Sequence, residues 1–324
     1  SFFKGRKERF LMISKNAIIE ADHVQIGKNV VIGDGVEIKC KDRIFIGDNS
    51  VLTKDIKINC TSFEAGEYLY MTDRCEVGRG GCYGPNSRVK IGNYVGIFEG
   101  TVINPSESVE IGDHIGGDVM IWTHGAWLDV LQGFPAEFGS VKIGKNVWLP
   151  ARSIVLPNVT IGDNSVIGIN SIINRSLPEG CFAAGSPCKV IKENVYPKKL
   201  TEKERSVIVN DILKDWLINC EMKKISKNLD VKYKSGEIIL WQNLPKTVQQ
   251  KNAKLLAKVK IKNEEDKNLD EYLDKRNIKT RYETIFDLNN RTISGYNNNI
   301  VQDLRDYLRR RGIKIYTGEL FRSI

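Results

Sequence analysis

Histidine is scarce in this chain, and the patterns that mark several function classes are missing. Only three histidines occur among the 324 residues, at His23, His114 and His124, so an imidazole base has few candidates. No apolar run approaches the ~20 residues that cross a bilayer. The residues Ser1–Lys4 do not resemble a secretory signal. We therefore expect a cytoplasmic protein without a membrane span.

The seven cysteines include no Cys-x-x-Cys pair, and their number is odd. Both facts argue against a disulfide framework and against a zinc site. We interpret the cysteines as reduced thiols that pack inside the fold, and we expect no metal.

Positive charge is concentrated in the C-terminal part of the chain. Residues 1–200 carry 23 Lys and Arg against 22 Asp and Glu, whereas residues 201–324 carry 26 against 18. This excess is either an ordinary solvated surface or a segment that attracts an anionic partner. An acidic glycan, a nucleotide-linked sugar or a membrane surface would fit, and we expect no nucleic-acid partner.

Aliphatic residues recur at a strict spacing of six in the middle of the chain. The run consists of Ile143, Leu149, Val155, Ile161, Ile167 and Ile173. Helices repeat every 3.6 residues and strands every two, so neither explains this period. A chain that winds round a triangular prism does, because each face takes one hexapeptide and turns one aliphatic side chain inward. Three faces make a coil of about eighteen residues, and stacked coils pair at the ~4.8 Å strand spacing.

The repeat also contains an Ile-Gly-x-x opening that occurs eight times and ends on a turn residue. Asn or Gly holds the fourth position in most copies: Asn29, Gly35, Asn49, Asn146, Asn164 and Asn170. These residue types accept the left-handed backbone that a sharp corner requires. Tyr94 and His114 hold the position in two other copies, and His is also enriched at positive φ. We interpret His114 as a corner residue and His23, before the first copy, as structural.

Two steps between these copies are much longer than eighteen residues. The step from Ile46 to the next copy is 45 residues, so we expect distorted coils over residues 55–88. The step from Ile111 to the next copy is 32 residues, one coil plus fourteen. The extra residues must leave the prism, which predicts a projecting loop over residues 124–140. Loops held out by a rigid scaffold are where function concentrates.

The sequence predicts three parts: an N-terminal segment at 1–16, a solenoid domain at 17–199 and a basic α+β domain at 200–324. In the last part, residues 201–204 (Thr-Glu-Lys-Glu) indicate a capping box at the start of a helix. We expect an apolar face on that helix, formed by Val207, Ile208, Ile212, Leu213, Trp216 and Leu217.

A hairpin and a second helix are also expected in the C-terminal part. Residues 284–288 and 291–296 flank Asn289-Asn290, which is typical of a β-hairpin. Apolar residues at helical spacing from Ile300 to Leu308, followed by Gly312, predict a helix that ends before the glycine.

The most specific motifs occur in a fixed order. Ile121-Trp122-Thr123-His124 precedes the loop, Asn146-Val147-Trp148 follows it, and Ala184-Gly185-Ser186-Pro187 closes the repeat. Residues 17–195 thereby resemble the hexapeptide-repeat acyltransferases, and most closely the branch of galactoside, maltose, serine, xenobiotic and capsule-type sugar acetyltransferases. The resemblance implies a left-handed parallel β-helix, acetyl-CoA as donor, and a homotrimer with active sites between subunits.

His124 stands at the position of the family's catalytic base. Imidazole suits proton removal at neutral pH, and the resemblance implies direct attack of the acceptor on the thioester, without an acyl-enzyme. A base histidine usually has an orienting partner. Candidates are Asp118, Asp129 and Glu99, and we favour Glu99 because stacked coils bring residues about one coil apart face to face.

The resemblance also implies that CoA lies along a prism edge beside the last coils. The candidate cofactor-binding residues are Trp148, Ala151, Gly168, Ile169, Ser186 and Lys189. Relatives often have Ala where this chain has Ile169, so we expect a backbone contact there. In the loop, Trp127 and Phe134 are candidates for binding an acceptor sugar or for packing on a neighbouring subunit.

We predict O-acetyl transfer to a carbohydrate hydroxyl, such as that of a surface or capsular polysaccharide or its precursor, and the basic domain favours an acidic one. The alternative is N-acetylation of an amino sugar or a nucleotide-linked sugar. A β-helix carbonic anhydrase would need three zinc histidines, and the three here are too widely spaced. A non-catalytic scaffold would not need His124 or the loop. A fused nucleotidyltransferase is disfavoured because no Gly-rich nucleotide domain precedes the repeat.

Overall fold

The computed structural model describes residues 11–79, 82, 84–112, 114–126, 128–223, 229–242, 283–295, 298–315 and 317. They form two units that divide between Lys198 and Lys199. The first is a parallel β-solenoid and the second is a small α+β unit, which confirms the predicted fold class.

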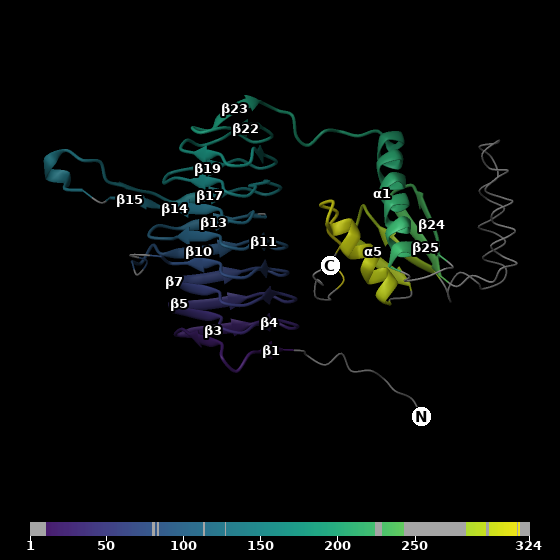
Figure 1. Cartoon of the computed structure of the whole chain (residues 1–324), viewed down its shortest axis with the longest axis horizontal. Coiled ribbons are helices and arrows are strands. Elements are labelled where there is room, and N and C mark those ends of the chain that lie inside the picture. Colours follow the sequence, from purple (N-terminus) through teal and green to yellow (C-terminus); the bar gives the residue numbers. More distant parts are fainter. Residues whose placement is uncertain are drawn as a thin grey trace, which may run out of the picture. The chain divides into compact units, whose positions relative to one another are not determined.

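The solenoid has three faces, and the chain crosses them in the order face 1, face 2, face 3 (Figure 1). Face 1 holds β1 (Met12–Ile13), β4 (Val31–Ile32), β6 (Val51–Leu52), β8 (Tyr70–Met71), β11 (Gly96–Ile97), β20 (Val166–Ile167), β22 (Phe182–Ala184) and the antiparallel β23 (Lys189–Lys192). Face 2 holds β2 (Ile18–Glu20), β9 (Glu76–Val77), β12 (Val102–Asn104), β14 (Met120–Trp122), β18 (Ile154–Val155) and β21 (Ile172–Ile173). Face 3 holds β3 (His23–Ile26), β10 (Arg88–Ile91), β13 (Val109–Ile111), β17 (Val141–Ile143) and β19 (Thr160–Ile161). Two longer strands, β5 (Glu37–Ile46) and β7 (Lys57–Ala65), run through faces 2 and 3.

The prism has three corners, and each takes its name from a feature found there. The hairpin corner joins face 2 to face 3. The Ile-Gly corner joins face 3 to face 1, and the small-residue corner joins face 1 to face 2. Each corner repeats in every coil, so a residue type that suits a corner recurs along the solenoid.

Aliphatic side chains fill the interior of the prism. The six aliphatic residues that recur at a spacing of six, from Ile143 to Ile173, are each at most 2% exposed. They belong to one apolar core that extends from Val30 to Cys188. Ile143 stacks directly between Ile111 and Ile161 of the adjacent coils. Full burial of such a side chain contributes ~1.5–3 kcal/mol, so every coil is stabilised by its neighbours.

The predicted distortion over residues 55–88 is wrong for most of that stretch. Strands β7, β8 and β9 pair in parallel with both neighbouring coils. The pattern is hard to recognise because Cys60, Phe63 and Ala65 take inward positions and are buried there. Among the described residues, the irregular segment lies between β9 and β10 and consists of Gly78, Arg79, Cys82 and residues 84–87, none of which is in a strand.

Corner residues adopt the left-handed backbone that the repeat predicts. Positive φ values of 53–67° occur at Asn29, Gly35, Asn49, Asn146, Asn164 and Asn170. Tyr94 also has φ 61°. The ring of His114 instead links stacked coils, because its Nδ1 accepts a hydrogen bond from the Gly96 N–H at 2.7 Å.

The second unit combines two helices with a four-stranded antiparallel sheet. The sheet order is β24 (Leu229–Lys234), β25 (Glu237–Gln242), β26 (Glu283–Asp287) and β27 (Thr292–Gly295). The pairing of β26 with β27 confirms the predicted hairpin. The helices are α1 (Glu202–Met222) and α5 (Asn299–Arg309), and both contribute to one apolar core with the sheet.

The capping box of α1 is present. The Glu204 carboxylate accepts hydrogen bonds from the N–H and the hydroxyl of Thr201, each at 2.8 Å. The predicted apolar face is partly wrong, because Val207 and Ile208 are exposed. Ile212, Leu213 and Trp216 are buried as predicted, Leu217 packs against the same core, and Val209 and Cys220 complete the buried face.

All seven cysteines are buried and none forms a disulfide, in agreement with thiols packed inside the fold. No helix in the described part of the chain is long and apolar enough to cross a membrane.

Candidate active site

A hairpin leaves the prism at the hairpin corner between β14 and β17 (Figure 1). It begins with β15 (His124–Gly125), passes through a 3-10 turn (Val130–Gln132) and returns as β16 (Glu137–Phe138). Because β17 resumes in register with β13, the solenoid continues as if the extra residues were absent. The predicted projecting loop therefore has a β-ribbon at its base.

The hairpin exposes large apolar side chains. Leu131 is 93% exposed, and Phe134 and Phe138 are 43% and 55% exposed. The turn at its end is stabilised locally, since the Asp129 carboxylate accepts a hydrogen bond from the Leu131 N–H at 2.9 Å. Trp127 lies outside the described residues.

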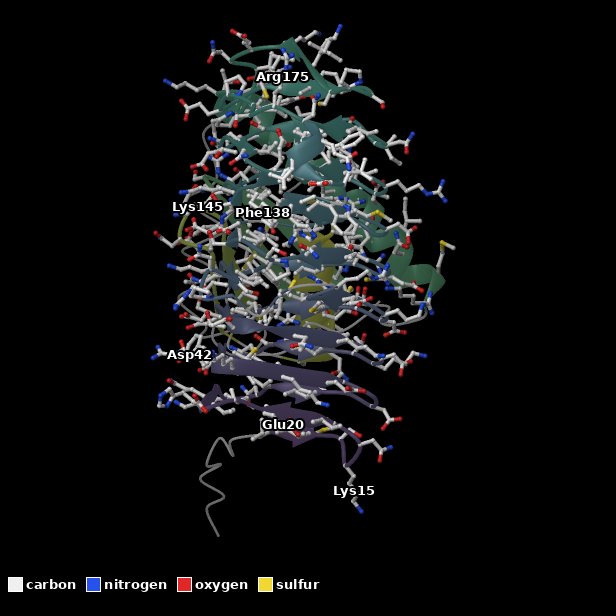
Figure 2. All side chains as sticks on the ribbon, turned by 90° about the vertical axis from the view of Figure 1, so that its left-hand side faces the viewer. Lys15, Glu20, Asp42, Phe138, Lys145 and Arg175 are labelled. Atoms are coloured by element: carbon white, nitrogen blue, oxygen red, sulfur yellow. The ribbon has the colours of Figure 1, made fainter. Side chains whose placement is uncertain are left out.

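His124 sits at the foot of the hairpin, half-buried against the solenoid. Its ring stacks on Phe138 with centroids 5.7 Å apart and 16° between the planes. Phe138 is labelled in Figure 2, which views the solenoid from the side of the hairpin. The Nδ1 atom of His124 lies 2.8 Å from Oδ1 of Asn104 and 3.0 Å from Oγ of Ser106. The imidazole is thus held both by an aromatic ring and by polar contacts.

Asn104 is the last residue of β12 in the preceding coil, and Ser106 follows two residues later. Hydrogen bonds from Thr123 hold the backbone of this segment in place. The Thr123 hydroxyl donates to the Asn104 carbonyl at 2.8 Å and accepts from the Glu107 N–H at 2.9 Å. Thr123 also anchors the hairpin, because its carbonyl accepts from the Gly139 N–H at 2.9 Å. These bonds position His124 over the preceding coil.

The structure places the three predicted orienting carboxylates in other contacts. Glu99 forms an ion pair with Arg74, and the Asp129 carboxylate caps the 3-10 turn. Asp118 occupies a corner with φ 53°, where its N–H donates to the Glu99 carbonyl. The repeat itself is the sequence signal for the residues that contact Nδ1 of His124. Eighteen residues before His124 is Ser106, and Asn104 pairs with Trp122 across the same step.

The candidate cofactor residues gather at the small-residue corner. The N–H of Asn170 donates to the Ala151 carbonyl at 3.2 Å, so residues 168–170 stack on Ala151. Close spacing requires small residues here: a Cβ on Gly168 would lie 2.6 Å from the Cβ of Ala184. Ile169 is 70% exposed and Trp148, on face 1, is 62% exposed. Ser186 and Lys189 follow at the end of the repeat and are exposed as well.

The structure does not bring these residues to His124 within one chain. Ala151 and Gly168 precede strands of face 2, whereas His124 follows a strand of that face. Three residues at ~3.3 Å each make the face roughly 10 Å wide. Within the described residues, no group of three or more His, Cys, Asp and Glu could hold a metal ion. The absence of a metal therefore stays a prediction.

The repeat matches a known family. Residues 140–175 match the family described as "Bacterial transferase hexapeptide (six repeats)". A putative acetyltransferase of Saccharomyces cerevisiae is 40% identical over 111 residues, which are 33% of this chain and 51% of that protein. Galactoside O-acetyltransferase of Escherichia coli is 51% identical over 53 residues, 16% of this chain and 26% of the enzyme. The chain therefore spans about half or less of the relatives it matches.

Solved structures give a weaker likeness. The polySia-specific acetyltransferase NeuO covers 66% of this chain over its full length, at 17% identity and a TM-score of 0.39. AntD, an N-acyltransferase of Bacillus cereus, covers 52% of this chain with 90% of its own, at 22% identity and a TM-score of 0.39. Likeness at this level carries no conclusion about activity.

Fold and repeat together define the class: a parallel β-helix built from hexapeptide coils, with a hairpin expelled beside a half-buried histidine. Residues 140–175 carry the hexapeptide repeat of bacterial transferases, and the chain is similar over part of its length to acetyltransferases.

Proposed function

We propose that this chain is an acetyl-CoA-dependent O-acetyltransferase with a carbohydrate acceptor and with His124 as general base. The observation that carries the proposal is the placement of His124. Its ring is stacked on Phe138 at the foot of the hairpin, and its Nδ1 is held by Asn104 and Ser106. The acetyltransferase names of the relatives support the reaction class.

The reaction needs one proton transfer in each direction. The imidazole of His124 removes the proton of the acceptor hydroxyl as its oxygen attacks the thioester carbonyl. The tetrahedral intermediate then collapses, the C–S bond breaks, and the imidazolium returns the proton to the CoA thiolate. A backbone N–H of a neighbouring coil is the kind of donor that would stabilise the oxyanion.

We propose that CoA lies along the small-residue corner of a second copy of the chain. The corner with Ala151, Gly168 and Ile169 is one face away from His124 in the same protomer. A homotrimer, in which the hairpin corner of one copy meets the small-residue corner of the next, would join the two halves of the site. The exposed apolar side chains of the hairpin, together with Trp148, are the type of surface that such contacts bury.

The acceptor is proposed to be a surface or capsular glycan or its precursor, modified in the cytoplasm. The excess of positive charge in residues 201–324 favours an acidic glycan, because charge of one sign concentrates ligands of the other. Aromatic faces such as that of Phe134 suit a sugar ring.

The test is incubation with acetyl-CoA and a panel of neutral and acidic glycans, followed by measurement of thiol release. The His124→Gln variant should lose ~10²–10⁴-fold of the rate. The matched control His23→Gln replaces an exposed histidine on another coil and should keep the wild-type rate. Near wild-type turnover by His124→Gln would sink the base assignment.

The same assay separates O-acetylation from N-acetylation. Hydroxylamine cleaves an acetyl ester but leaves an acetamide, so resistance of the product would favour an amino-sugar acceptor. If no acceptor gives thiol release, and if acetyl-CoA does not bind in calorimetry, the solenoid is a non-catalytic scaffold.

A further inference from the structure

A chain of contacts at the hairpin corner runs from a backbone carbonyl to the His124 ring. The side-chain amide nitrogen of Asn104 donates to the carbonyl oxygen of Arg79, and Oδ1 of Asn104 lies 2.8 Å from Nδ1 of His124. The three groups come from three successive coils. We propose that Asn104 and the Arg79 carbonyl fix the ring proton of His124 on Nδ1, which leaves Nε2 as the base.

The Arg79 carbonyl selects the orientation of the amide. A carbonyl oxygen can only accept, so the Asn104 atom that faces it must be the NH₂ group. Two donors face the opposite end, since the N–H and the hydroxyl of Ser106 lie 3.4 and 3.3 Å from Oδ1. A flipped amide would set acceptor against acceptor and donor against donor. Asn104 is 0% exposed, so water cannot compensate such a mismatch.

The oriented amide in turn selects the tautomer of His124. An amide oxygen has no proton to donate, so a ring nitrogen 2.8 Å away must carry one. The Ser106 hydroxyl can accept from the same N–H while its own proton points to Asn104. In a neutral imidazole with hydrogen on Nδ1, the lone pair resides on Nε2. Without the amide oxygen, the Ser106 hydroxyl could either donate to Nδ1 or accept from it, so the ring would divide between both tautomers.

This arrangement gives a role to the irregular segment between β9 and β10. Gly78 has φ 103°, and a Cβ at this position would lie 1.8 Å from the Asn59 carbonyl oxygen. Only glycine lets the chain leave face 2 so close to the preceding coil, and this turn presents the Arg79 carbonyl to Asn104. A neutral amide also orients the ring without the negative charge by which a carboxylate would stabilise the imidazolium.

The role of Nε2 as base rests on the proposed function, but the proton position can be measured without any activity. Long-range ¹H–¹⁵N spectra of protein labelled with ¹⁵N-histidine report the tautomer of each neutral ring. Three histidines give three patterns, and His124→Gln identifies the relevant one. We expect the pattern of hydrogen on Nδ1.

The variant Asn104→Leu removes the amide acceptor and leaves the Ser106 hydroxyl at Nδ1, which can donate as well as accept. We expect mixed tautomers and a kcat lowered by ~10²-fold, within the range that a general base supplies, with KM for acetyl-CoA unchanged. The control Asn219→Leu removes an amide that also donates to a backbone carbonyl, but in the second unit. It should change neither the tautomer nor kcat.

Variants of the irregular segment test the Arg79 carbonyl. Gly78→Ala should displace the Arg79 peptide and populate the second tautomer. Glu76→Gln breaks the 2.7 Å ion pair of the Arg79 side chain and leaves the carbonyl in place, so the Nδ1–H pattern should persist. An unchanged tautomer in folded Gly78→Ala would contradict the role of the carbonyl.

Asn104→Asp keeps an acceptor at Nδ1 and covers the case in which Asn104→Leu does not fold. The added carboxylate stabilises the imidazolium, so the acid limb of the kcat–pH profile should move to higher pH. An acid limb at the wild-type pH in Asn104→Asp would contradict the contact between residue 104 and Nδ1 of His124. A wild-type ring protonated on Nε2 overturns the proposal whatever the activity. Absence of thiol release from every acceptor would overturn the proposed function instead.

Discussion

Burial inside the coils changes the acid–base behaviour of single side chains. Desolvation raises the pKa of Cys75 to about 12 and the pKa of Cys82 to about 11. The sulfur of Cys75 also lies 3.2 Å from the carbonyl oxygen of Phe98, to which a protonated thiol can donate. The folded solenoid therefore keeps these thiols neutral at pH values where a free cysteine ionises.

This difference predicts a loss of solenoid stability in alkali. The thiol of Cys75 has an ordinary pKa of 9.0, so above pH 9 the unfolded chain releases a proton that the folded chain keeps. The stabilising contribution is complete below pH 9 and decreases by about 1.4 kcal/mol per pH unit until about pH 12. Urea unfolding at several pH values, with Cys75→Val as reference, measures it. Parallel pH dependences of wild type and variant would contradict the prediction.

The residues around His124 differ in how far the sequence predicts them. His124 stands in a motif of fixed order, and its spacing from the next coil marks the expelled loop. Asn104 and Ser106 carry no motif, because their contact depends on how the corner turns and on which way each side chain points. The favoured Glu99 has the charge expected of an orienting partner. It lies before the face 2 strand β12, at the opposite end of that face from His124, and forms an ion pair with Arg74 there.

At the scale of elements, the period of six predicts the coils well wherever the inward residues are Ile, Val or Leu. The period fades in β7 because any apolar side chain of suitable volume satisfies the core, as Cys60, Phe63 and Ala65 do. Corner positions are stricter, since only a few residue types accept a left-handed backbone. The corners therefore predict the coil count better than the core does.

The hairpin is an element that can be removed without touching the prism. Strands β15 and β16 already pair as an antiparallel ribbon, so a two-residue Asn-Gly turn can join Gly125 to Glu137 in place of residues 126–136. We expect unchanged thermal unfolding of the solenoid, because none of the described residues between 126 and 136 belongs to the buried core. Acetyl transfer should fall through a higher KM for the acceptor or through loss of the oligomer.

Light scattering decides between these two effects of the shortened hairpin. A retained oligomer with a raised acceptor KM assigns the hairpin to sugar binding, whereas a monomer assigns it to subunit packing. A shortened protein with wild-type kinetics and mass would show that the hairpin has neither function.

At the scale of the whole molecule, the described residues form one large apolar core in the solenoid and another in the α+β unit. The solenoid holds every residue proposed for catalysis and for CoA, while the excess positive charge lies in residues 201–324. One protomer alone cannot complete the proposed site, because the hairpin corner and the small-residue corner of its solenoid lie one face apart.

A mixing experiment tests whether the site is shared between copies. His124→Gln lacks the base but keeps the small-residue corner, and Ala151→Trp blocks that corner but keeps the base. Each variant alone should be inactive, at about three times the 36.6 kDa chain mass. After joint unfolding and refolding, about a quarter of the wild-type activity should return. A site at a head-to-tail interface works only where a subunit with His124 meets a subunit with an unblocked small-residue corner. In an equal mixture each of these two conditions is met in half of the cases, so both are met in about a quarter of the sites. Mixed trimers without activity would show that each chain builds its whole site alone.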